Sequence, residues 1–212
     1  MHIPCSETTT LKILTFEEAR MRCEYNNASI AKELSASYDR EKWIYIPDFY
    51  TEYRYVLGTV GKRPLITIGI NPSYAEAGVL DNTLKSVERI AKGNGFDSFI
   101  MFNVYAQRST NPDFMDKHFN KQLHYENMQA FRWLLEKTEK EPVIWAAWGT
   151  LIEKESYLKT CLSDMVAIAE TFRAKWCNAG KISVKGHPHH PLYLKKDEKL
   201  MSFDIESYLE KL

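Results

Sequence analysis

The sequence predicts an α/β fold, a three-layer α/β/α sandwich built on a central, mainly parallel four-stranded sheet. Two observations support this prediction. Apolar strand-like runs alternate with helical patterns from about residue 65 onward, an order that builds βαβ units with right-handed crossovers. The run LITIGI at 65–70 is almost entirely apolar, as expected of a strand that is covered on both faces.

The chain before this central strand is expected to add a helix and two edge strands. Thr15 followed by Glu18 fits a capping box, which predicts a helix near the N-terminus. WIYIP at 43–47 and YRYVLGTV at 53–60 are rich in aromatic and β-branched residues. These two stretches therefore predict edge strands that lead into the central strand.

The next elements alternate between helix and strand. Asn71-Pro72 is expected to end the central strand, and Asp81 can cap a helix that ends at Gly93-Asn94-Gly95. FIMFNVY at 99–105 repeats the strand signal, and a helix is predicted from about residue 121 to residue 137.

Two further strands and a last helix complete the predicted sandwich. VIWAAW at 143–148 is a third apolar strand, and Thr150 with Glu153 fits a second capping box after it. KISV at 181–184 predicts a short fourth strand. A helical pattern closes the chain within 196–212.

Length and composition favour one globular domain without a strong overall charge. With 212 residues, of which 44% are hydrophobic, the chain can bury a full core, and we expect residues 1–50 to be an N-terminal extension and residues 51–195 the core. Lys plus Arg and Asp plus Glu number 28 each, so no net positive field would attract a polyanion from a distance. Any contact with nucleic acid would have to be local.

The cysteines and the termini suggest a cytoplasmic protein. Cys5, Cys23, Cys161 and Cys177 are scattered without a C-x-x-C pair, which is poor spacing for a metal site and typical of reduced thiols. The sequence shows no apolar run of membrane-spanning length and no signal-peptide pattern, so no contact with a membrane is expected.

Polar residues follow the predicted strands where each strand ends. They are Asn71, Asn103, Trp148-Gly149 and His190. Because ligands of open α/β sheets bind where the carboxyl ends of the strands come together, this pattern predicts a small-molecule site at that edge.

The two asparagines each allow two interpretations. Asn71 can hold a water molecule without deprotonating it, or Asn71-Pro72 can simply begin a turn. Asn103 lies in an apolar strand, where a buried amide needs hydrogen-bond partners. Its adjacent donor and acceptor match the edge of a nucleobase, or they fix the loop that follows.

The other polar candidates lie in two loops. Residues 186–192, GHPHHPL, carry three histidines, which can stabilise negative charge or move a proton. A metal site is the alternative, because His187 and His189 can face the same way in an extended chain, but no carboxylate or cysteine accompanies them and no metal is expected. Arg108, beside Ser109 and Thr110, suits a phosphate oxygen or pairs with a nearby aspartate.

Taken in order, four motifs resemble those of the uracil-DNA glycosylase superfamily. Gly69 to Ser73 is similar to the Gly-Ile-Asn-Pro-Gly motif of its mismatch-specific branch. The uracil-specific branch has a base-reading Leu-Asn, an apolar strand ending in Trp-Gly-Ser, and a His-Pro-Ser-Pro-Leu loop. These three motifs resemble Phe102-Asn103, Val143 to Thr150, and Gly186 to Leu192.

A closer resemblance is to a family of uncharacterised bacterial and phage proteins, a domain of unknown function. Its pattern joins Asn-Pro-Ser, Asp-x-Thr, an Asn-to-Pro stretch, Glu-Asn, Trp-Gly and His-Pro-Leu-Tyr. In this chain the pattern corresponds to Asn71 to Ser73, Asp81 with Thr83, Asn103 to Pro112, Glu126-Asn127, Trp148-Gly149 and His190 to Tyr193.

The glycosylase resemblance implies a fold of that type and a role for each matched residue. Asn71 would position the attacking water, Asn103 would pair with the base, and either His190 or His187 would stabilise the departing base, with His190 preferred. The predicted catalytic residues are therefore Asn71, His190 and His187. The predicted substrate-binding residues are Asn103, Ser73, Tyr74, Arg108, Asp81, Thr83, Trp148 and Gly149.

The resemblance implies an N-glycosylase that needs no cofactor and acts on a base in DNA, in a single strand or in a nucleotide. Ser73 stands where the uracil-specific branch has a bulky tyrosine that excludes a 5-methyl group, which favours a 5-substituted pyrimidine. The alternative is a non-catalytic nucleotide- or nucleic-acid-binding module. The sequence leaves the oligomeric state open.

Overall fold

A mixed sheet runs through the protein, whose computed structural model is described here for residues 38–47 and 51–212. The predicted helix at Thr15 lies outside the described residues. The strands are β1 (Trp43–Ile46), β2 (Val56–Thr59), β3 (Pro64–Gly69), β4 (Ser98–Asn103), β5 (Val143–Ala146), β6 (Lys175–Ala179) and β7 (Leu200–Ser202).

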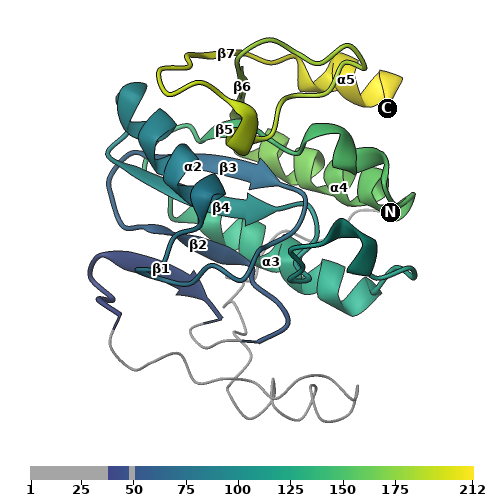
Figure 1. Ribbon diagram of the computed structural model, residues 1–212, viewed down its shortest axis with the longest axis horizontal. Coiled ribbons are helices and arrows are strands. Elements are labelled where there is room, and N and C mark those ends of the chain that lie inside the picture. The colour runs from purple at the N-terminus through teal and green to yellow at the C-terminus, as the bar shows by residue number, and fades with distance from the viewer. Residues whose placement is uncertain (1–37, 48–50) are drawn as a thin grey trace.

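The sheet has seven strands in the order β1-β2-β4-β3-β5-β6-β7, with β1 at one edge and β7 at the other (Figure 1). The strands β4, β3, β5 and β6 are parallel to one another, whereas β1, β2 and β7 pair antiparallel. The predicted α/β class is confirmed, and the two predicted N-terminal strands are present. β1 is an edge strand, whereas β2 lies between β1 and β4. The sheet is larger than the predicted four strands.

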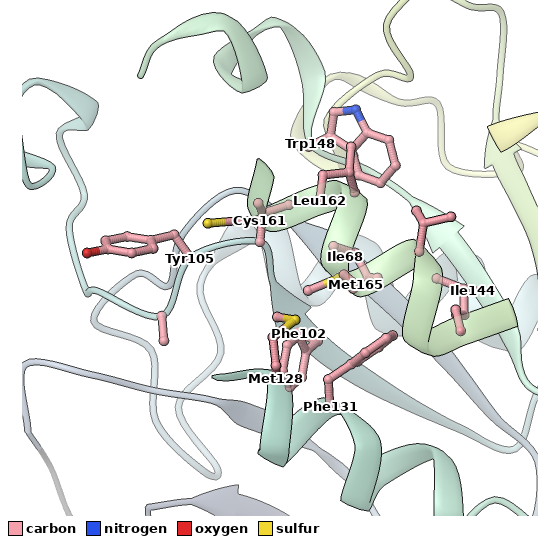
Figure 2. Close-up of a cluster of buried hydrophobic side chains, with 14 of the residues drawn as sticks. Ile68, Phe102, Tyr105, Met128, Phe131, Ile144, Trp148, Cys161, Leu162 and Met165 are labelled. Atoms are coloured by element: carbon pink, nitrogen blue, oxygen red, sulfur yellow. The ribbon is translucent and has the colours of Figure 1, made fainter. Parts of the chain in front are cut away.

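Helices cover both faces of the sheet. They are α2 (Asn82–Gly93), α3 (Lys121–Glu136), α4 (Tyr157–Thr171) and the short α5 (Ile205–Lys211). The side chains of β3 alternate between two buried clusters: Leu65 belongs to the cluster that includes α2, and Ile66 to the one that includes α3 and α4. Both faces are covered, which explains the nearly continuous apolar run in this strand. Figure 2 shows Phe102 of β4, Phe131 of α3 and Met165 of α4 brought together in the second cluster.

The order of the strands creates a crevice at their carboxyl ends. The chain passes from β3 through α2 to β4 on one side, and then through α3 to β5 on the other side of β3. Adjacent strands whose connections leave in opposite directions form a topological switch point, where open α/β sheets bind ligands. The carboxyl ends of β3 and β5 therefore form the expected place for a site.

The predicted start of α2 is confirmed in atomic detail. Asp81 is the residue before the helix, and its Oδ1 accepts a hydrogen bond from the backbone N–H of Leu84 at 2.8 Å. This bond satisfies one of the four N–H groups that have no partner within the first helical turn.

Two predicted elements that follow β5 in the chain are wrong. The fourth parallel strand is β6, because Trp176 to Ala179 are buried, whereas residues 181–184 lie in a loop. Gly180, with φ of 69°, turns the chain out of the sheet, a conformation that favours glycine. The exposed Ile182 and Val184 gave a false strand signal.

The second wrong element is the capping box at Thr150 and Glu153. Residues 149–153 form a 3-10 turn without a side-chain cap, and α4 begins only at Tyr157. The Glu153 carboxylate instead binds Lys185 at 2.7 Å.

The C-terminal segment is also more than a helix. The strand β7 pairs with β6 before α5 begins at Ile205, so residues 196–212 contribute an edge strand to the sheet. Among the described helices, none is both long and apolar enough to cross a membrane.

Candidate functional site

A cavity of about 700 Å³ opens at the carboxyl ends of the parallel strands. Its walls come from the segment between β3 and α2, the segment between β4 and α3, the turn after β5 and the segment between β6 and β7. These segments include the ends of β3 and β5, so the cavity lies at the switch point of the sheet. We call it the switch-point pocket.

Most of the residues predicted from sequence lie in its walls. The residues that line the switch-point pocket include Asn71, Ser73, Asp81, Thr83, Trp148, Gly149 and His190. Four other predicted residues are not among those that line it: Tyr74, Asn103, Arg108 and His187.

Asn71 presents an oxygen acceptor because its amide nitrogen is already engaged. Its Nδ2 donates to the carbonyl of Ser109 at 2.7 Å and faces the carbonyl of Pro72 at 3.4 Å. The opposite orientation of the amide would place oxygen against oxygen, so the two carbonyls fix the side chain. Oδ1 is left as the acceptor that Asn71 can offer to a bound molecule or to water.

His190 can offer a hydrogen-bond donor, because one of its two ring nitrogens is already engaged as an acceptor. Its Nδ1 accepts from the backbone N–H of Leu192 at 3.4 Å, which leaves the proton of the neutral ring on Nε2. Burial lowers the pKa of His190, and the Asp81 carboxylate opposes part of that effect. The imidazole is thus neutral near pH 7, with an N–H to give.

The turn after β5 holds the His190 segment against the sheet. Gly149 has a φ of 63°, and its N–H donates to the carbonyl of Pro188 at 3.0 Å. The Cβ of His190 lies 3.6 Å from where a Cβ on residue 149 would stand. That distance is an ordinary van der Waals contact, so it is the positive φ that favours glycine at this position.

Trp148 and His187 hold this turn in place through hydrogen bonds to one buried hydroxyl group. The Trp148 indole is fully buried at one edge of the core cluster (Figure 2), and its Nε1–H donates to the Tyr208 hydroxyl at 2.9 Å. The same hydroxyl lies 2.8 Å from Nδ1 of the buried His187. His187 therefore anchors the segment between β6 and β7, while its neighbours His189 and His190 line the pocket.

Asn103 lies just beneath the wall, with 1% of its surface exposed. The hydrogen-bonding pattern places its amide nitrogen 3.2 Å from the carbonyl of Asn71 and 3.3 Å from that of Phe102. Asn127 of α3 in turn donates to the carbonyls of Asn103 and Val104, at 3.0 and 3.2 Å. The visible effect of this chain of amides is to fix the backbone at Asn71.

Two arginines lie on the same side of the site. Arg108 donates to the Ser73 carbonyl at 2.7 Å and to the Tyr45 hydroxyl, so it holds the loop after β3. Arg54, which sequence reasoning missed, lines the pocket and donates to the Ala75 carbonyl at 2.8 Å. Burial raises the pKa of Tyr45, although both guanidinium groups act against that rise. Sequence reasoning searched for polar residues after the carboxyl ends of strands. Arg54 instead precedes β2, an antiparallel strand whose amino end lies beside the carboxyl ends of the parallel strands.

The described residues that line the pocket include no strong base or thiol nucleophile. Their one carboxylate is Asp81, which caps α2. Cys161 and Cys177 are buried free thiols elsewhere, and burial raises the pKa of each to about 12. No group of three or more His, Cys, Asp or Glu side chains within 38–47 and 51–212 is arranged to hold a metal ion. Apart from the Arg54 guanidinium and the Asp81 carboxylate, the walls offer neutral hydrogen-bonding groups.

A family model described as a protein of unknown function (DUF1643) matches residues 54–192. The chain belongs to this family. The predicted membership of an uncharacterised domain family is therefore confirmed. No curated protein and no solved structure matches the chain. The DUF1643 match contains every residue that lines the switch-point pocket except Tyr193.

Proposed function

We propose that the protein hydrolyses an N-glycosidic bond to a pyrimidine-type base, in DNA or in a nucleotide, in the manner of the uracil-DNA glycosylase superfamily. One observation carries the proposal. Asn71, whose amide oxygen is left as an acceptor, and His190, whose neutral imidazole keeps an N–H, line the same pocket at the switch point of the sheet.

These two groups suit hydrolysis through a positively charged sugar. As the bond between the sugar carbon and the base nitrogen breaks, the electron pair leaves with the base, and the His190 Nε2–H donates a hydrogen bond to the developing anion. The water oxygen, held by Asn71 Oδ1, then bonds to the sugar carbon, and the proton that the water loses passes to the departing base anion. An amide is sufficient here because an oxocarbenium-like carbon does not need a fully deprotonated water.

The other walls are suited to a base and a sugar. Ser73 is small, so the pocket has room for a group on the 5-position of a pyrimidine. Thr83 and Arg54 add a hydroxyl and a cationic donor that suit the sugar or a phosphate. In this proposal Asn103 contributes through the loop at Asn71 that it supports.

A second candidate is a nucleobase-binding module without catalysis. The observation that favours it is the capped Asp81: the one carboxylate lining the pocket already accepts a backbone hydrogen bond, and no other described group there is a general base. Such a module would use the same acceptor and donor to hold a base without breaking its bond.

Base release is the measurement that separates these candidates. Purified protein is incubated with free nucleosides, nucleotides and oligonucleotides that carry uracil or 5-substituted pyrimidines, and the free base is quantified by chromatography. We expect release from at least one 5-substituted substrate. Asn71→Ala and His190→Ala should each lower the rate by about 10²-fold or more, as removing one preorganised donor does elsewhere. His118→Ala, at an exposed position outside the pocket, is the matched control and should leave the rate unchanged.

The outcomes are distinct. No release from any substrate at high protein concentration would refute the enzyme. A thermal shift with a free base or nucleoside, without release, would then support the binding module. Release that survives both pocket substitutions would show that another site carries the activity.

A further inference from the structure

Exposed apolar side chains are concentrated in the chain segments that form the switch-point pocket. Among the residues that the structure describes, ten large hydrophobic side chains are exposed. Each of seven either lines the pocket or lies within two residues of one that does: Tyr74, Val79, Phe114, Ile182, Val184, Leu192 and Tyr193. We call these seven the apolar rim. A concentration of this kind on a protein surface marks an interaction site.

The aromatic members of the rim come from three different segments. Tyr74 directly follows the pocket residue Ser73, and Phe114 ends the 3-10 turn that begins at the pocket residue Pro112. Tyr193 itself lines the pocket, is 78% exposed, and has its ring 6.0 Å from that of His190. Rings placed on separate loops around one opening offer stacking surfaces on several sides of a group held in the pocket.

Two of the lysines beside the rim are paired with carboxylates, whereas Lys181, next to Ile182, forms no ion pair among the described residues. Lys154 forms an ion pair with Asp113, next to Phe114. Lys185, next to Val184, lies 2.7 Å from Glu153. Attraction of phosphates by these lysines would have to compete with the existing ion pairs, so a partner of the rim gains more from ring contact than from charge.

We propose that the apolar rim stacks against the unpaired bases that flank the target base in a single-stranded nucleic acid. This inference rests on the proposed function, which puts one base in the pocket. Stacking on aromatic side chains binds single strands with little dependence on sequence, because every base has a π-face. A duplex offers mainly phosphates to the outside while its bases stack on one another, so it would leave the exposed rings of the rim without a stacking partner.

The apolar rim is tested by measuring oligonucleotide binding alone, independently of base release. Fluorescence anisotropy is measured with a labelled single strand of about 12 nucleotides, an abasic strand of the same length and the matching duplex. We expect the base-containing single strand to bind at least about tenfold more tightly than the other two. Phe114→Ala and Tyr193→Ala should each weaken that binding by roughly 5- to 100-fold, the loss expected for one stacked base.

Tyr125→Ala is the matched control. Tyr125 is a 59% exposed tyrosine on α3, none of whose residues line the pocket, so its removal should leave the affinity unchanged. The affinity should also depend only weakly on salt, with a slope of log K against log[salt] near that of about one or two phosphate contacts at roughly −0.7 each.

Several results would overturn the inference. These are equal binding of the abasic strand, an equal loss with Tyr125→Ala, or no binding of any oligonucleotide. A dimer in sedimentation that Phe114→Ala converts to a monomer would instead show that the rim joins two copies of the chain. Base release from a mononucleotide without oligonucleotide binding refutes the rim alone, whereas rim-dependent binding without base release refutes the proposed enzyme alone.

Discussion

Tyr208→Phe is expected to destabilise the protein strongly although it removes a single oxygen atom. That oxygen accepts from Trp148 Nε1 at 2.9 Å and lies 2.8 Å from His187 Nδ1. Trp148 is fully buried and His187 is 3% exposed, so neither group can turn to bulk water. The substitution keeps the ring and its packing, and leaves two buried polar groups without this partner.

The magnitude follows from those two groups. A buried donor or acceptor that loses its partner costs about 1–3 kcal/mol, so we expect a loss of about 3 kcal/mol in the free energy of unfolding for Tyr208→Phe. For a chain of this size that corresponds to a Tm lower by roughly 6–12 °C. Tyr125→Phe, at an exposed tyrosine, should change the unfolding free energy by less than about 0.5 kcal/mol.

Urea unfolding and the indole resonances provide the measurement. Unfolding curves of the three proteins give the free energies, and a proton–nitrogen spectrum should show the Trp148 Nε1–H signal shifted in Tyr208→Phe. A loss no larger than that of Tyr125→Phe, with this signal unmoved, would refute the hydrogen-bonded chain from Trp148 to His187.

Two further predictions concern pH and backbone packing. Burial lowers the pKa of His190, so the unfolded chain binds a proton near pH 6.5 before the folded protein does, and stability is full above that pH and lost as the pH falls toward the lowered pKa. Between about pH 7.5 and about pH 5, the Tm of His190→Gln should therefore fall less than the Tm of the parent protein. The Tm of the control His118→Gln, at an exposed position, should fall as much as that of the parent. Identical pH profiles for all three proteins would contradict this prediction. Gly58→Ala should cost more than about 2 kcal/mol in urea unfolding, since its Cβ would lie 2.3 Å from the Phe99 carbonyl oxygen. Gly93→Ala meets nothing within 4 Å and should cost nothing, and similar values for the two glycine variants would show that β2 and β4 are not packed as described.

The parallel core was predictable because its strands carry a strong local signal. LITIGI and FIMFNVY are buried on both faces, and Asp81 has the side chain that a helix start needs, so pattern and structure agree there. The fourth strand failed because Ile182 and Val184, β-branched residues typical of strands, are exposed in a loop. The true strand includes Asn178, whose side chain is satisfied by the carbonyl of Gly180 at 2.7 Å, a bond that no sequence pattern reveals.

The candidate site was predictable in its position more than in its detail. Asn71, Gly149 and His190 were found as strand-end or loop residues, and they do line one pocket. Arg54 was missed because it precedes the antiparallel strand β2, where the rule about carboxyl ends gives no signal. The difference between His187 and His190 depends on the Tyr208 hydroxyl, which lies in a distant part of the chain.

The pocket therefore depends on residues beyond those that form its walls. The family match ends at Leu192, yet the segment that carries His190 is anchored by His187 to Tyr208 of α5. The same hydroxyl binds Trp148, directly before the glycine turn that contacts Pro188. A single buried oxygen from the C-terminal helix thus connects both sides of the turn that places the imidazole. Because the proposed chemistry relies on neutral hydrogen bonds and not on a strong base, its rate depends on how accurately that turn is held. The C-terminal helix α5 therefore helps to position His190 in the proposed site.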